Sequence, residues 1–299
     1  MKKRIFRGTV GIGVFLLIGI IIGFSIFGFS MSNINKQSYS YEEDENSYSL
    51  ISDEYIICVY ADAWIDIEKL GYNNALEFLE YCAKCIEHLV ERTNKTDWSD
   101  ELTNTSEDGK AIIKICTVDD ITSRVLFPEG NIYLNKDNIQ MGMSDIEHEL
   151  THLVMGECEE GTLSEGFAAY MEHMEFGANN FSLYGLDIDV VIQNLYLAAQ
   201  YEALTRDILS TVGAAYDSSI KHQQYGQIFY VYACSYVNYL VSTYGIEAVV
   251  EIFEVSGSES AYQTYIGKDM LSIKSEWLEY LKQYEGEMSA EEIIAYLSE

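Results

Sequence analysis

The sequence predicts an α+β protein in which a small β-sheet is followed by a mostly helical part, with a transmembrane helix ahead of both. Three observations lead to this prediction. A long uncharged apolar run lies near the N-terminus, short runs rich in β-branched and aromatic residues follow up to Asp137, and helical periodicity dominates from there to the end. Apolar residues make up 48% of the chain, which is enough to bury a substantial core.

The N-terminal segment has the composition of a membrane anchor. Basic residues are concentrated within positions 1–7, and no charged residue occurs from Thr9 to Ser30. An apolar run of about 20 residues matches the hydrocarbon thickness of a membrane when it is helical. Because positive charge marks the cytoplasmic side, we expect residues 1–7 inside the cell, a signal-anchor at 8–30 in the cell membrane, and the rest of the chain extracellular. Small residues up to Ser30 also allow cleavage there, which would release a secreted protein.

Residues 31–53 are polar and acidic, and we expect them to form a flexible stalk between the membrane and a domain of residues 54–299. That domain should consist of an α/β part, residues 54–137, and a helical part, residues 138–299. The formal net charge of −30 disfavours nucleic acid as a partner, because a phosphate-binding groove needs clustered Lys and Arg.

Three strands and one helix are predicted in the α/β part. Tyr55–Tyr60 (YIICVY), Ala111–Val118 and Gly130–Leu134 (GNIYL) have the composition of strands. Asn73–Arg92 has apolar residues at helical spacing. We expect Gly130–Leu134 to be a sheet edge along which an extended peptide could pair.

Cysteines offer a possible second site. Six are present, and an exported domain could pair them in disulfides. Cys82 and Cys85 have the spacing of a zinc or redox CxxC motif, yet no second CxxC completes a four-thiolate site. Buried thiols or disulfides are therefore favoured over a structural zinc for this pair.

The segment from Ser144 to His152 (SDIEHELTH) carries the chemistry of the chain. Ser144 and Glu147 have the spacing of a capping box, so a helix is expected to begin there. His148 and His152 then lie one turn apart on the same face, where two imidazoles can bind one Zn²⁺. Glu149, beside the first histidine, is positioned to serve as a general base.

A third metal ligand is expected after Gly156, which is a natural end for that helix. The candidate is Glu165, because Ser164 could cap a second helix and leave Glu165 in its first turn. His, His and Glu form one of the standard catalytic zinc sets. Cys158 lies where the metzincin pattern has its third ligand, but that pattern needs a glycine where Met155 stands, so Cys158 is expected to be a buried thiol or a disulfide partner.

These motifs resemble a known group of enzymes. HELTHLVMG followed by LSEGFAAYMEH looks like the gluzincin zinc metallopeptidases, in particular their peptidase MA-like branch, and the M1 aminopeptidases share the HExxH…EGFA signature. The resemblance implies a zincin-like helical lobe with Zn²⁺ held by His148, His152 and Glu165. The sequence departs from a thermolysin-type site at Ala169, where that site has Asp. It also lacks the Gly-x-Met-Glu-Asn element of M1 aminopeptidases, so exopeptidase specificity is not supported.

The resemblance also implies a tyrosine that stabilises an oxyanion, on a helix within residues 225–253. Aligned on Leu240, the matching residue is Tyr230, and Tyr225 and Tyr232 are alternatives. A packing role in the core is an equally good interpretation of Tyr230.

Together these observations predict a zinc-dependent peptidase on the outer face of the membrane, with Glu149 and Tyr230 as catalytic residues and a peptide or protein as substrate. The alternative is a surface module on the same fold that binds zinc or a peptide without turnover. A third interpretation is an adhesion or signalling ectodomain in which HExxH arises by chance. Glu149 favours the enzyme, because a purely structural zinc site has no need of that carboxylate.

Overall fold

The computed structural model of the chain describes residues 39–119, 122–177, 227–284 and 289. All of them belong to the compact unit Ser38–Glu299, which is distinct from Met1–Gln37. The expected signal-anchor at 8–30 lies outside the described residues. Within the described part of the chain, no helix is both long and apolar enough to cross a membrane.

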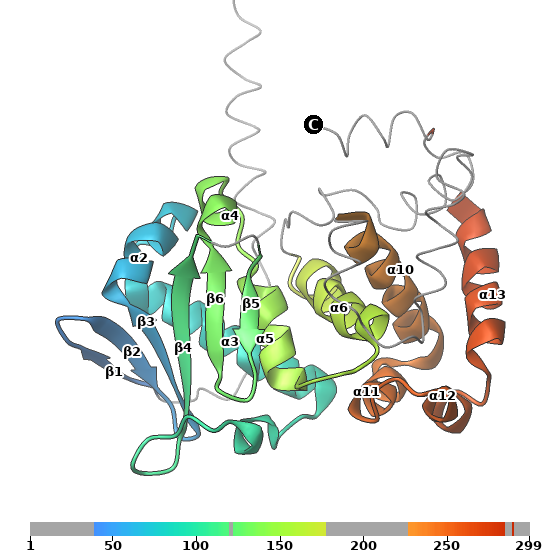
Figure 1. The fold of residues 1–299 in the computed structure, drawn as a ribbon, viewed down its shortest axis with the longest axis horizontal. Helices are drawn as coiled ribbons and strands as arrows, with labels where there is room; N and C mark the ends of the chain where they lie inside the picture. The colour runs from blue at the N-terminus through green and yellow to red at the C-terminus, as the bar shows by residue number, and fades with distance from the viewer. Residues whose placement is uncertain (1–38, 120–121, 178–226, 285–288, 290–299) are drawn as a thin grey trace, which may run out of the picture. The chain divides into compact units, whose positions relative to one another are not determined.

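A six-stranded mixed sheet forms the first part of the fold (Figure 1). Its spatial order is β1-β2-β3-β4-β6-β5, with parallel pairing of β3 with β4 and of β4 with β6, and antiparallel pairing elsewhere. The strands are β1 (Ser40–Glu43), β2 (Ser47–Ile51), β3 (Tyr55–Tyr60), β4 (Ala111–Val118), β5 (Arg124–Leu126) and β6 (Asn131–Asn135). The bounds predicted for β3 and β4 are confirmed, and the predicted third strand occurs one residue later, as β6.

For residues 39–53, the structure corrects the expectation of a flexible stalk at 31–53, because β1 and β2 form a hairpin on the edge of β3; residues 31–38 lie outside the described residues. The Asp44 carboxylate accepts hydrogen bonds from the backbone N–H groups of Asn46 (2.7 Å) and Ser47 (2.8 Å), which closes the turn. Leu50 is fully buried. The acidic composition of this segment gives no strand signal, because only one side of β2 contributes to the core.

The predicted sheet edge is also corrected. β6 pairs with β4 on one side and β5 on the other, so β5 is the edge strand. A tight turn reverses the chain between them, in which Gly130 has φ of 70° and its N–H donates to the Leu126 carbonyl at 2.9 Å. A strand of three residues is too short to give a periodic signal, which is why the sequence did not predict β5.

Helices α3 and α5 lie against one side of the sheet, and the helical part follows it in the chain (Figure 1). The predicted helix at Asn73–Arg92 is α3, which begins after the Asn74 cap and ends at Asn94, where φ is 58°. After Asp137 the described residues contain helices and no strand, as expected. The α-helices are α2 (Ala61–Ile67), α3 (Ala75–Thr93), α4 (Lys136–Gln140), α5 (Ile146–Met155), α6 (Gly161–Tyr170), α10 (Gln227–Tyr244), α11 (Ile246–Glu254), α12 (Glu259–Tyr265) and α13 (Met270–Leu281).

Four shorter helical turns complete the described fold. Three are 3₁₀ turns and one is a π-helical turn that continues α6. They are η1 (Glu68–Leu70), η2 (Trp98–Glu101), η3 (Met171–Glu175, the π-helical turn) and η5 (Lys282–Tyr284). The α+β class with a mostly helical C-terminal part is therefore confirmed for the residues described.

The closest packing in the helical part is between α6 and α10, which lie side by side (Figure 1). A Cβ atom on Gly166 would lie 2.5 Å from the carbonyl oxygen of Ala233 and 2.8 Å from Cγ2 of Val237. Such distances are shorter than any normal contact, so glycine is required for the two backbones to meet. Gly166 therefore fixes how closely α10 approaches α6.

We expect Gly166→Ala to destabilise the protein by about 1–3 kcal/mol, because the added methyl group forces α10 away from α6. Urea denaturation followed by circular dichroism measures the loss. Ser164→Ala, on the same helix and half-buried, is the matched control and should change stability by less than about 0.5 kcal/mol. Equal stability of Gly166→Ala and the control would contradict the packing described here.

Candidate metal centre

Helix α5 carries the two histidines of the HExxH segment, and its first turn differs from the predicted capping box. The helix begins at Ile146 with Asp145 as its N-cap residue, and Ser144 Oγ accepts a hydrogen bond from the Ile146 N–H at 3.2 Å. Glu147 does not reach back to the cap. Its carboxylate is buried against α3, where it accepts a hydrogen bond from the Tyr81 hydroxyl. The reason is that this side of α5 faces the protein core from the first residue of the helix onward.

The two imidazoles project from the same face of α5, as their spacing predicts. Their ring centroids are 4.8 Å apart and their Nε2 atoms are 3.1 Å apart. His148 is 7% exposed and His152 is half-buried. Helix α5 ends at Gly156, where φ is 74°, as the sequence predicts.

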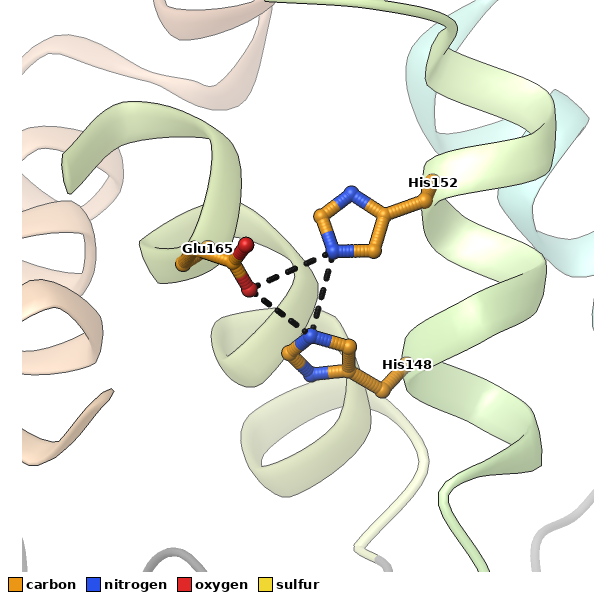
Figure 2. Close-up of side chains that lie close together, drawn as sticks. All are labelled: His148, His152 and Glu165. Atoms are coloured by element: carbon orange, nitrogen blue, oxygen red, sulfur yellow. Dashed lines mark hydrogen bonds and ion pairs between the residues drawn. The ribbon is translucent and has the colours of Figure 1, made fainter. Parts of the chain in front are cut away.

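Glu165 reaches the same point from α6 (Figure 2). Its Oε2 atom lies 3.2 Å from Nε2 of His148 and 3.4 Å from Nε2 of His152. The predicted Ser164 cap is wrong, because α6 begins at Gly161 and the Glu160 carboxylate accepts hydrogen bonds from the first free N–H groups. Glu165 therefore lies in the second turn of α6 rather than the first.

The three donor atoms have the spacing that a zinc ion requires. With bonds of about 2.0–2.1 Å, ligands at the corners of a tetrahedron are separated by about 3.3 Å. The observed separations of 3.1, 3.2 and 3.4 Å fit this value, and two imidazoles with one carboxylate form a donor set that zinc accepts. Among the residues that the structure describes, no other group of three or more His, Cys, Asp or Glu side chains is arranged to hold a metal.

The electrostatics of this cluster favour a cation. Burial opposes ionisation of Glu165, but the adjacent His152 and His148 rings hold the pKa of its carboxyl well below the usual range. Burial likewise disfavours charge on His148, and the carboxylates of Glu165 and Glu172 outweigh this and raise the pKa of the imidazole. Negative charge therefore lies next to both nitrogens of the His148 ring, from Glu165 at Nε2 and from Glu172 at Nδ1.

Glu149 lies on α5 beside the cluster and is 4% exposed. Burial raises the pKa of its carboxyl group to about 8, with a smaller opposing effect from His148. A carboxyl group in this range can both accept and release a proton near neutral pH. The expected role of Glu149 as a base stays a prediction.

Of the described candidate tyrosines, Tyr230 is the one beside the histidines. Its ring lies edge-on to His148 with 5.8 Å between centroids. Tyr232 is buried and packs its ring against Trp277 on α13, with centroids 6.3 Å apart. Tyr225 lies outside the described residues. The assignment from Leu240 therefore selects the tyrosine that borders the candidate metal centre.

The cysteines do not contribute to this centre. Cys158 is half-buried, with its Sγ atom 3.7 Å from the Glu160 carbonyl oxygen, and burial raises the pKa of its thiol to about 12. All six cysteines lie in the described part of the chain, and each is a thiol rather than half of a disulfide. Cys82 and Cys85 are buried thiols in α3, which is one of the two states favoured over a structural zinc from the sequence, the other being a disulfide.

One residue of the site was missed from the sequence. Glu172, in the π-helical turn η3, is 2% exposed and its Oε2 atom lies 3.4 Å from Nδ1 of His148. A thermolysin-type site has an acid at the position of Ala169. A residue seven positions after Glu165 also returns to the same helix face, and that spacing is the signal which could have indicated Glu172.

We expect zinc to stabilise the folded chain against thermal and urea unfolding, by about 2.7 kcal/mol when free zinc is a hundredfold above its Kd. Scanning calorimetry with zinc, and then with excess chelator, measures the gain and its reversal. His152→Gln should abolish the gain. His88→Gln, which lies outside the donor group, is the control and should retain it. Zinc stabilisation that survives in His152→Gln would argue against this centre.

Comparison with protein families and with curated proteins gives no relative from which a function could be transferred. No protein-family model matches the chain, and no curated protein matches it. The function must therefore be argued from the geometry of the candidate centre.

Proposed function

We propose that the chain is a zinc-dependent peptidase of the gluzincin type. The observation that carries the proposal is the meeting of His148, His152 and Glu165 with donor separations of 3.1 to 3.4 Å, next to a buried carboxyl group on Glu149. Zinc in such a site supplies a Lewis acid that polarises a carbonyl and lowers the pKa of water. Three protein ligands leave a tetrahedral position open for that purpose.

The remaining chemistry falls to residues of the chain. Glu149 is one position from His148 on α5, and we assign it the transfer of a proton from the attacking water to the leaving amine. The Tyr230 ring lies against His148 from α10, and we assign its hydroxyl the donation of a hydrogen bond to the developing oxyanion. These roles distribute acid–base chemistry and charge stabilisation over two separate helices.

A peptide substrate is supported by the edge of the sheet. The Lys114 N–H donates a hydrogen bond to the Gly130 carbonyl. In this parallel register, the N–H and C=O groups of Ile132 face β4, and those of the residues before and after it in β6 face β5. Val125 pairs opposite Ile132, so its own N–H and C=O face away from the sheet. Because β5 packs beside α5, an extended peptide that pairs with Val125 would run along the metal-binding helix (Figure 1).

The predicted location of the domain and the predicted type of its helical part also belong to the proposed function. We infer that the domain is displayed extracellularly by a signal-anchor at 8–30, or is secreted after cleavage near Ser30, and that the helical part is zincin-like. The absence of an acid at Ala169 favours the competing module without turnover, because a thermolysin-type site has Asp there. The contact of Glu172 with His148 weakens that argument, because a carboxylate does reach the first histidine.

We expect Glu149→Gln to bind zinc normally and to lose peptide hydrolysis by about 10²–10⁴-fold, since the amide cannot accept the proton. The full chain in detergent, assayed with a fluorogenic peptide library and by zinc quantification, provides both readouts. Glu159→Gln, an exposed residue between α5 and α6, is the matched control. Substantial hydrolysis by Glu149→Gln would contradict the proposal, and zinc binding by a wild-type chain that hydrolyses nothing would favour the binding module.

We expect Tyr230→Phe to lower kcat by about 10²-fold with little change in KM, because it removes one donor to the oxyanion. Steady-state kinetics on the best peptide of the library measures the effect. Tyr232→Phe removes a hydroxyl from the same helix on the side facing Trp277 and should leave kcat unchanged. A wild-type kcat in Tyr230→Phe would show that the ring only packs against His148.

A further inference from the structure

The two nitrogens of the His148 ring face different carboxylates. Nε2 lies 3.2 Å from Oε2 of Glu165, at the meeting point of the three candidate ligands. Nδ1 lies 3.4 Å from Oε2 of Glu172, on the far side of the ring. Both carboxylates come from one continuous helical segment, α6 followed by η3, and Glu172 is almost completely buried.

We propose that Glu172 is a positioning residue for the metal centre, an inference that rests on the proposed function. A carboxylate next to Nδ1 keeps the ring proton on that nitrogen, which leaves the lone pair of Nε2 free to bind a metal. It also fixes the rotation of the imidazole and increases its basicity as a ligand. Glu172 thus takes the role of the Asp in a thermolysin-type site, from a position three residues after Ala169, which has no functional group.

The π-helical turn explains how Glu172 is held beside His148. The Phe176 N–H donates to the Met171 carbonyl at 2.9 Å, and this wide turn contains Glu172 and Glu175. Glu175 is anchored to α3, where its two oxygens lie 2.7 Å from Arg92 Nη2 and 3.0 Å from Arg92 Nε. One turn therefore presents one carboxylate to α5 and ties another to α3, so its position relative to His148 is fixed from both sides.

The pair Glu172 and Glu175 offers a matched comparison within one turn. Glu175 makes a bidentate ion pair with Arg92 and accepts a hydrogen bond from the Tyr170 hydroxyl at 3.1 Å, without contact to His148 in any described interaction. Its removal should affect the docking of η3 on α3. Removal of Glu172 should affect the metal centre. Stability and zinc affinity therefore separate the two roles.

The test uses the full chain in detergent and compares Glu172→Met, Glu172→Gln and Glu175→Gln. Zinc affinity is measured by competition with a chromophoric chelator, and the site geometry by the absorption spectrum of bound Co²⁺. We expect Glu172→Met to weaken zinc binding by about 10–100-fold and to shift the Co²⁺ spectrum. Glu172→Gln should lose less, because its amide oxygen can still accept from Nδ1–H.

Glu175→Gln should be less stable to urea and retain wild-type zinc affinity. An unchanged affinity and an unchanged Co²⁺ spectrum in Glu172→Met would overturn the inference while leaving the proposed function intact. Equal losses of affinity in Glu172→Gln and Glu175→Gln would also overturn it, because they would point to a general loosening of η3. A wild-type chain without zinc affinity would contradict the proposed function itself, and the inference with it.

Discussion

The structure depends on bringing three polar donor atoms to one point inside the protein. Two imidazole nitrogens and one carboxylate oxygen lie within 3.4 Å of each other, on residues that are buried or half-buried. Removing such groups from water is unfavourable unless each finds a partner. The arrangement is consistent with a shared cation, and it sets how α5 and α6 must meet.

The position of α6 in that meeting is also fixed by its contact with α10. Gly166 directly follows Glu165, and the absence of a side chain there lets Ala233 of α10 approach within contact of the α6 backbone. Phe167 packs against Phe253 of α11, with 5.9 Å between ring centroids. A candidate metal ligand, a close helix contact and a core aromatic thus occupy the consecutive positions Glu165, Gly166 and Phe167. The EGFA motif can therefore be understood as packing as well as chemistry.

Sequence alone predicted the elements with a strong periodic signal and the three residues that meet at the candidate centre. The predicted bounds of β3 and β4 agree with the structure and those of α3 nearly do, because their alternating or helical apolar patterns are long enough to recognise. It missed β5, which has only three residues, and treated β2 as stalk because most of its side chains are not fully buried. These failures share one cause, since tertiary pairing rather than local composition forms both strands.

The errors at the site have a different physical origin, and they bear on how the centre is built. The sequence predicts Ser144 and Ser164 as helix caps because serine is a common cap, yet Asp145 and Glu160 are the N-cap residues. Glu160 is buried by the surrounding helices, so tertiary structure makes an unusual cap possible.

Glu172 was missed for a related reason. The spacing of seven residues from Glu165 indicates a shared helix face, but the sequence does not reveal that α6 widens into a π-helical turn, which directs Glu172 to α5 and Glu175 to α3. Turns of this kind interrupt α-helices often at functional sites, at some cost in regular hydrogen bonding. The cost is understandable if the turn supports His148, because an imidazole that is free to rotate would not hold its Nε2 lone pair on the metal.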